Sequence, residues 1–174
     1  MIKTYLKRGN IISLVASLII LAGLVLLDLK GISYALSPQF LAIMWVVWFL
    51  AIPSFMSYHK SDLEKPKFMD YFAIPAIIIT FFGLILASLG DFLGIEVILL
   101  GYTLEPVAGI SIYLTTKKFS YVNSSLFFWG AVVFTAGLPL YLANLGIVSI
   151  AGDIVKMVGI VGLLMNSRLM AEAK

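Results

Sequence analysis

Two charged residues are unusual because each falls inside a long apolar stretch of the sequence. Glu105 lies twelve residues before Lys117, and Lys156 lies twelve residues before Arg168. In an α-helix, twelve residues span roughly 18 Å, so both charges would lie deep in their stretches and at similar depth. An ionised group in hydrocarbon is costly unless it finds a partner. We therefore predict that Glu105 and Lys156 form a buried ion pair near the middle of a membrane.

Small residues surround both charges at helical spacing. They lie three or four positions away, which places them on the same helix face as the charge. Membrane helices approach one another closely through faces of this kind. Both charges should therefore point into a bundle of helices. The small residues are Gly101, Ala108, Gly152 and Gly159.

Two further polar residues complete a predicted intramembrane polar cluster of Glu105, Lys156, Asp153 and Tyr102. Asp153 lies one helical turn from Lys156, and Tyr102 lies one turn before Glu105, where its hydroxyl would donate a hydrogen bond. Pro106 lacks an N–H and would free a backbone carbonyl in the preceding turn, which another polar group must satisfy.

The polar cluster has two interpretations, and the residues leave both open. In the first, the ion pair fixes how the helices pack, and removing one partner would leave an uncompensated buried charge. In the second, the cluster is a proton or cation relay, or the floor of a solute site.

Several chemistries need residues that this chain lacks. It contains no cysteine, and His59 is its only histidine. Zinc sites, iron–sulfur clusters and bis-histidine haem sites are built from such residues. We predict no metal site, no cofactor and no catalytic residue. An acid–base pair would have to combine Glu105 with Asp153 or Tyr102, so we favour a protein that is not an enzyme.

Two tryptophans are candidate ligand-facing aromatics. Trp45 and Trp48 are three residues apart and share a helix face. Trp48 also lies twelve residues before Lys60, the position that Glu105 and Lys156 occupy in their own stretches. Packing in the protein or facing lipid is the alternative role for both rings.

The composition indicates the elements that position these residues. The chain of 174 residues is 61% hydrophobic and 12% charged, whereas soluble domains carry about 25% charged residues. Six apolar stretches approach the roughly 20 residues that cross a bilayer as a helix. We predict an all-α integral membrane protein, a single polytopic domain over residues 1–174, with spans at 10–27, 35–56, 71–89, 92–115, 122–142 and 147–169.

The basic residues between these stretches predict the orientation. Ten Lys and Arg residues fall at the two termini and in the second and fourth loops, against Lys30 alone in the other loops. An excess of basic residues marks the cytoplasmic side. We expect a multi-pass protein of the cell membrane with both termini in the cytoplasm. The clusters are too short for a phosphate-binding surface, so no nucleic-acid partner is expected.

The chain also resembles three repeated two-helix hairpins. The pattern G-L-x-L begins at Gly23, Gly83 and Gly137, and a further glycine follows each seven to nine residues later. The later glycines are Gly31, Gly90 and Gly146. Two explanations stay open: internal repetition, which is a known way to build membrane folds, and chance matches, because glycine is frequent in membrane helices.

These features favour a small non-catalytic membrane protein. The first expectation is an accessory or structural subunit of a larger respiratory or transport complex, because the chain has little mass outside the spans and several small-residue faces. Its partners would be the lipid bilayer and either other membrane subunits or further copies of itself. The alternative is a self-contained small transporter, or an ion- or proton-conducting protein, that uses the polar cluster.

Overall fold

The computed structural model describes residues 2–172, and the side chains of residues 4–166. Every described element is a helix, and the connections are short. The elements in chain order are α1 (Ile2–Lys30), η1 (Ile32–Leu36), α2 (Pro38–His59), α3 (Lys67–Ser88), α4 (Leu93–Thr103), α5 (Glu105–Thr116), α6 (Tyr121–Gly137), η2 (Leu138–Ala143) and α7 (Ile147–Glu172).

Six segments of this chain are long and apolar enough to cross a membrane, which confirms the predicted number of spans. The first begins earlier and ends later than predicted, and the other boundaries lie within a few residues of the prediction. Helices suit this setting because they satisfy their own backbone hydrogen bonds without water. The segments are Thr4–Lys30, Pro38–His59, Lys67–Ser88, Leu93–Thr116, Tyr121–Ala143 and Ile147–Asn166.

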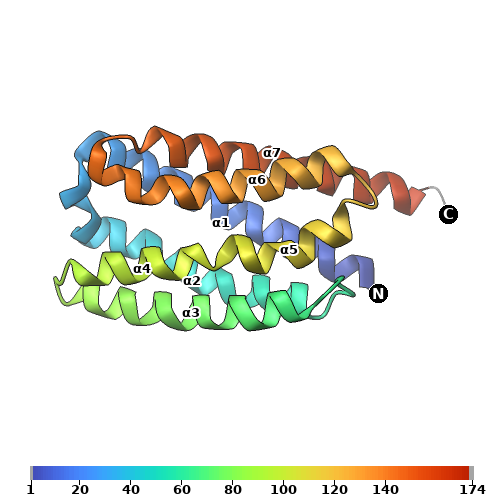
Figure 1. Ribbon diagram of the computed structural model, residues 1–174, viewed down its shortest axis with the longest axis horizontal. Helices are drawn as coiled ribbons and strands as arrows, with labels where there is room; N and C mark the ends of the chain where they lie inside the picture. Colours follow the sequence, from blue (N-terminus) through green and yellow to red (C-terminus); the bar gives the residue numbers. More distant parts are fainter. Residues whose placement is uncertain (1, 173–174) are drawn as a thin grey trace.

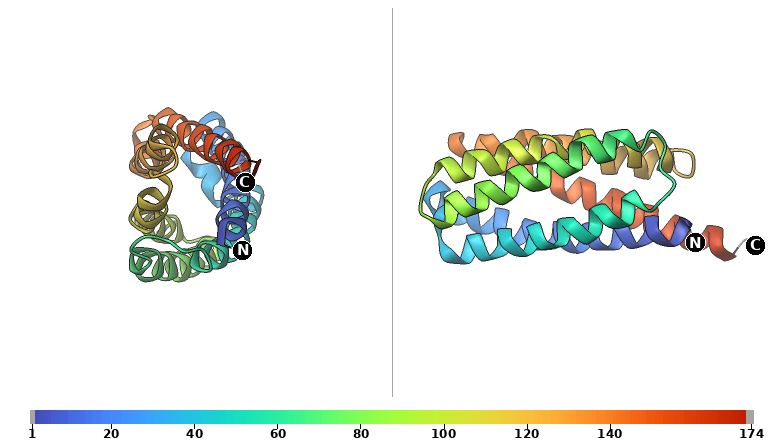
Figure 2. Two further views of the ribbon diagram at one scale, coloured as in Figure 1. Left: turned by 90° about the vertical axis from the view of Figure 1, so that its right-hand side faces the viewer. Right: turned by 90° about the horizontal axis from the view of Figure 1, so that it is seen from below.

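The six spans form a closed ring in chain order. Each span contacts the one before and the one after it, and α7 returns to contact α1. The end-on view shows the helices arranged around a common axis (Figure 2, left). Both termini lie at one end of the bundle, together with the α2–α3 and α5–α6 connections (Figure 1).

The turns at the opposite end use backbone conformations that favour glycine or asparagine. Gly31 has φ 83° between α1 and η1, and Gly90 has φ 86° between α3 and α4. The third turn uses Asn144, with φ 56°. Gly146, which the sequence pattern matches with Gly31 and Gly90, does not have a positive φ. Asparagine replaces glycine here because its short side chain tolerates the left-handed region.

The hairpin of α6 and α7 is packed through glycine. A Cβ on Gly130 would overlap the backbone at Lys156, and one on Gly152 would overlap the backbone at Phe134. The two helix backbones therefore touch at these points, as small residues in membrane helices allow. This contact sets the position of Lys156 relative to α6.

The fourth span is not one continuous helix. It divides at Leu104 into α4 and α5. Pro106 has no N–H, so the helical hydrogen bond to the carbonyl of Tyr102 is missing. At the break, the Leu104 N–H donates to the carbonyl of Gly101, three residues earlier, at 3.2 Å. The break places Glu105 at the first position of α5.

Candidate functional site

A cavity of about 190 Å³ lies inside the ring of helices. All six spans contribute to its wall, so the cavity is a property of the whole ring and not of one hairpin. Most of the wall is aliphatic or aromatic, and a few hydroxyl and charged groups interrupt it. One lining residue from each span, in chain order, is Ser13, Trp48, Thr80, Glu105, Phe134 and Lys156.

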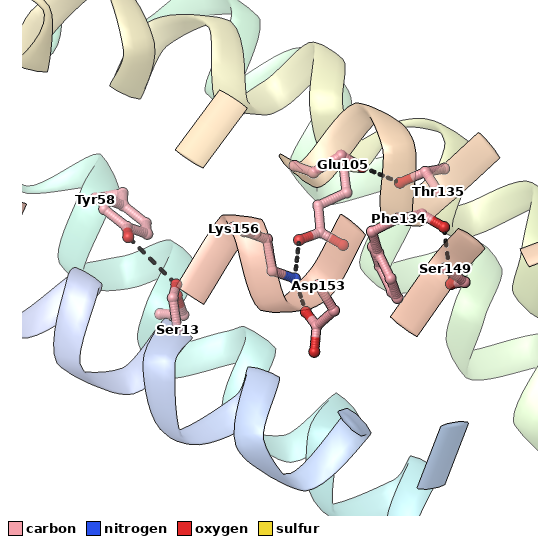
Figure 3. A network of polar contacts seen from close by, with 10 residues as sticks. Ser13, Tyr58, Glu105, Phe134, Thr135, Ser149, Asp153 and Lys156 are labelled. Atoms are coloured by element: carbon pink, nitrogen blue, oxygen red, sulfur yellow. Dashed lines mark hydrogen bonds and ion pairs between the residues drawn. The ribbon is translucent and has the colours of Figure 1, made fainter. Parts of the chain in front are cut away.

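Lys156 is the centre of the charged part of this cavity. Its Nζ lies 2.9 Å from Asp153 Oδ1 and 3.8 Å from Glu105 Oε1. The same ammonium lies 4.4 Å from the centre of the Phe134 ring, within the range of a cation–π interaction. The close-up view shows Glu105 reaching Lys156 from α5 while Asp153 approaches it from α7 (Figure 3).

The sequence predicts Glu105 as the ion-pair partner of Lys156, and the structure places Asp153 closer. Residues three apart on a helix are neighbours on its surface, so Asp153 reaches the ammonium without crossing between helices. Glu105 must reach it from another span. Lys156 is therefore shared between two carboxylates, one near and one more distant.

The two carboxylates differ in their surroundings. The Asp153 side chain is fully buried, whereas the Glu105 side chain is 44% exposed. Within the described part of the chain, neither Asp153 oxygen has a hydrogen-bond partner beyond its ion pair with Lys156. Glu105 lies on the cavity wall. If all three groups are ionised, the cluster carries one excess negative charge, and that charge is most accessible at Glu105.

One hydrogen bond beside this cluster joins α7 to α6, and another lies within α6 next to Phe134. The Ser149 hydroxyl donates to the Phe134 carbonyl at 2.9 Å, and the Thr135 hydroxyl donates to the Ala131 carbonyl at 2.9 Å. Phe134 itself is fully buried. The aromatic ring beneath the ammonium is therefore fixed by its own helix and by its neighbour.

Tyr102 lines the cavity but does not contact Glu105 as predicted. No hydrogen bond between the two is present in the described part of the chain. The Tyr102 ring instead packs edge-on against Phe134, with ring centres 5.7 Å apart. The two residues still share a helix face, since Leu104 between them keeps a right-handed helical conformation and both line the cavity.

The two candidate tryptophans have different roles. Trp48 lines the cavity, and its indole N–H donates to the Ile77 carbonyl on α3 at 2.9 Å. Trp45 is not part of the cavity wall; its N–H donates to Ser88 Oγ at 3.2 Å, and its ring packs against Phe81. Only Trp48 is placed to contact a ligand in this cavity.

A hydroxyl network between α1 and α2 was not predicted. Tyr58 donates to Asn10 Oδ1 at 2.8 Å, and Ser13 Oγ lies 3.2 Å from the Tyr58 hydroxyl and 3.0 Å from Ser54 Oγ. Ser13, Ser54 and Tyr58 all line the cavity. The available signal was the spacing of Asn10, Ser13 and Ser17, which share a helix face in an otherwise apolar span.

A second, smaller cavity of about 60 Å³ adjoins the first. Ile20 and Tyr102 line both cavities, so these two side chains form a wall between them. The second cavity is almost wholly apolar and extends to Ile32 and Leu142, near the turns at the end opposite the termini. The charged cavity and its hydroxyl network lie on the other side of this wall.

Together, the fold and the site define the class of the protein: it is a multi-pass helical membrane protein whose six spans surround a charged cavity. Within the described residues, no three His, Asp or Glu side chains converge as they would around a metal ion. Comparisons of the chain with protein-family models, with curated proteins and with solved structures find no match.

Proposed function

We propose that this protein is a self-contained small transporter that moves a proton or a small cation across the membrane through the central cavity. The observation that carries the proposal is the position of Glu105, a half-exposed carboxylate on the wall of a cavity that all six spans of the chain line. No partner chain is needed to complete such a site.

The choice between a structural ion pair and a relay depends on the number of carboxylates. Asp153 and Lys156 already form a close pair at 2.9 Å within α7, and that pair is sufficient to compensate the buried ammonium. Glu105 is a second carboxylate near the same ammonium, and it adds a negative charge that hydrocarbon disfavours. A structural role explains Asp153, whereas exchange of a proton or cation explains Glu105.

Proton flux into vesicles tests this function. The purified chain is reconstituted into liposomes that contain a pH-sensitive dye, and proton entry is driven in one series by a potassium gradient with valinomycin and in a second series by an outward gradient of a small cation. We expect acidification well above that of protein-free liposomes, and its loss in Glu105→Gln. A rate equal to that of protein-free liposomes in both series, or an unchanged rate in Glu105→Gln, would contradict the proposal.

Glu64→Gln is the matched control for this experiment. Glu64 is 40% exposed and pairs with Lys118 at the end of the bundle that contains the termini, so it resembles Glu105 in exposure and in having a lysine partner. It does not line the cavity. Its flux should equal that of the unmodified protein.

We also propose that the protein lies in the cell membrane with both termini in the cytoplasm. This orientation is supported by the basic residues at the end of the bundle where the termini lie. Because the chain has no cysteine, single cysteines report sidedness directly. A membrane-impermeant maleimide added to intact cells should label Asp91→Cys and spare Asp62→Cys, and the reverse pattern would overturn the orientation.

Internal repetition of three hairpins is part of the same proposal. Trp48, Glu105 and Lys156 occupy matching sequence positions in their hairpins, and all three line the cavity. If each hairpin is a unit, chains cut in the loops after His59 and after Thr116 should reassemble on coexpression. Failure of the three fragments to copurify would count against repetition.

The expectation of an accessory subunit remains a prediction. Large apolar side chains such as Phe82 and Trp129 are exposed on the outside of the ring, and such surfaces suit lipid as well as another membrane protein. Purification in mild detergent checks it: stoichiometric partner chains would support the subunit role, and a stable species made only of this chain would oppose it.

A further inference from the structure

We propose that the central cavity binds a small organic cation at Glu105 and that the cation replaces a proton there. This inference deepens the transport function proposed above by naming the class of solute, and it rests on the same cavity. It is carried by three properties of the wall: its volume, its excess carboxylate and its aromatic rings.

The volume of the cavity sets the size of the solute. An apolar cavity of about 150 Å³ holds benzene, and this one is slightly larger, at about 190 Å³. It therefore accommodates a molecule of about seven non-hydrogen atoms, in proportion to that reference. A hydrated inorganic ion would not use the apolar wall that makes up most of the cavity.

The charges of the site favour a cation over an anion. Asp153 lies 2.9 Å from the only ammonium of the cluster, so an incoming anion would have to displace a fully buried carboxylate. Glu105 is 3.8 Å from the same ammonium and 44% exposed. A solute in the cavity therefore meets a site with one carboxylate in excess. A single positive charge on the solute would neutralise it.

The aromatic rings of the wall suit an alkylated ammonium group. Trp48, Tyr58, Tyr102 and Phe134 all line the cavity. Phe134 already lies 4.4 Å from the Lys156 ammonium, so the protein stabilises a cation on this wall with its own side chain. Aromatic rings attract cations through their electron-rich faces, most strongly when water is excluded.

Binding and proton release balance without any covalent step between solute and protein. In the proposed exchange, a proton on Glu105 cancels the excess negative charge while the site holds no cation. When the cation enters, the O–H bond breaks, the proton leaves to water, and the resulting carboxylate pairs with the cation. The charge of the cavity is the same before and after the exchange. A proton gradient of the proposed transporter would then drive the cation in the opposite direction.

Choline and 3,3-dimethylbutan-1-ol are matched probes for this site. They have the same shape and differ in a single positive charge, because carbon replaces the nitrogen. Isothermal titration of the purified full-length chain in detergent, in two buffers of different ionisation enthalpy, measures affinity and the number of protons released. We expect choline to bind at least about tenfold more tightly than the alcohol, with release of one proton.

Variants separate the role of Glu105 from general stability. Glu105→Gln should weaken choline binding by at least about tenfold, an effect of the size expected for one lost charge contact, and should abolish proton release while leaving binding of the alcohol unchanged. Glu105→Asp should retain part of the binding, and Glu64→Gln all of it. Circular dichroism melting of each variant identifies any that fail to fold.

The results distinguish the solute class from the transport function. Equal binding of the two probes, no binding of choline, or unchanged choline binding in Glu105→Gln would overturn the cation site. Proton flux without choline binding would retain the transporter and reject this class of solute. Choline binding without proton flux, even when an outward choline gradient is imposed across the liposome membrane, would retain the site and reject the transport function.

Discussion

The α6–α7 hairpin and the broken fourth span lie on the same cavity but are built differently. In the hairpin, glycine contacts bring two backbones together, and Asp153 and Lys156 are buried as a pair. In the fourth span, Pro106 interrupts the helix, and Glu105 follows the break with a half-exposed side chain. One carboxylate is therefore held by packing, whereas the other remains accessible to a solute.

Breaking the buried pair should have the largest effect on stability. Lys156→Met leaves Asp153 fully buried without its counter-charge, which typically costs about 3–5 kcal/mol. The double change Asp153→Asn with Lys156→Met should recover most of that loss, because no buried charge remains. Thermal unfolding in detergent measures both, and equal stability of the single and double variants would contradict the structural role of the pair.

Adding one methyl group to the hairpin should have the next largest effect. A Cβ at residue 152 overlaps the backbone of Phe134, so Gly152→Ala should destabilise the protein by about 1–3 kcal/mol through overpacking. Gly109→Ala is the control, because the nearest atom to its Cβ is 4.0 Å away on Phe127. Gly109→Ala should be neutral or slightly stabilising in a chemical denaturation series. Equal losses in both variants would contradict the role of backbone contact at Gly152.

The hydroxyl network on the other side of the cavity should contribute less. Tyr58→Phe removes the hydrogen bond to Asn10 and leaves that buried amide oxygen without its donor, at a cost of about 1–2 kcal/mol. Tyr71→Phe makes the same chemical change on an exposed side chain of α3 and should cost nothing measurable. A matched pair of melting curves decides the point, and identical curves would mean that the network adds no stability.

The smallest stability effect is expected at Glu105. Its side chain is half exposed, and Asp153 still compensates Lys156 when Glu105 is replaced. Glu105→Gln should therefore change the free energy of unfolding by less than about 1 kcal/mol, as exposed ion pairs do. A loss as large as that of Lys156→Met in the same unfolding assay would make Glu105 part of the structural pair and remove the contrast between the two carboxylates.

The features predicted from sequence are those that depend on one helix at a time. The six spans follow from apolar length, and the common depth of Glu105 and Lys156 follows from helical rise measured from Lys117 and Arg168. Arg168 lies beyond the described side chains, so the structure tests only whether the two charges meet, and they lie 3.8 Å apart. Their proximity to each other reflects spans that meet around one axis.

The features that were not predicted depend on contacts between helices. Lys156 lies closer to Asp153 than to Glu105 because Glu105 must reach it from another span, at 3.8 Å against 2.9 Å. The network of Asn10 and Tyr58 exists because α1 packs along α2 in one register. The spacing of apolar residues within one span predicts neither the register between two helices nor the distance a side chain must cross to reach another helix.

Infrared difference spectroscopy distinguishes the two carboxylates, because the carbonyl band of a protonated carboxylic acid reports which of them gives up a proton. Adding choline should remove such a band in the unmodified protein and in Asp153→Asn, and Glu105→Gln should lack this change. A change that persists in Glu105→Gln and disappears in Asp153→Asn would contradict the account, since it would make the buried member of the pair the exchanging group.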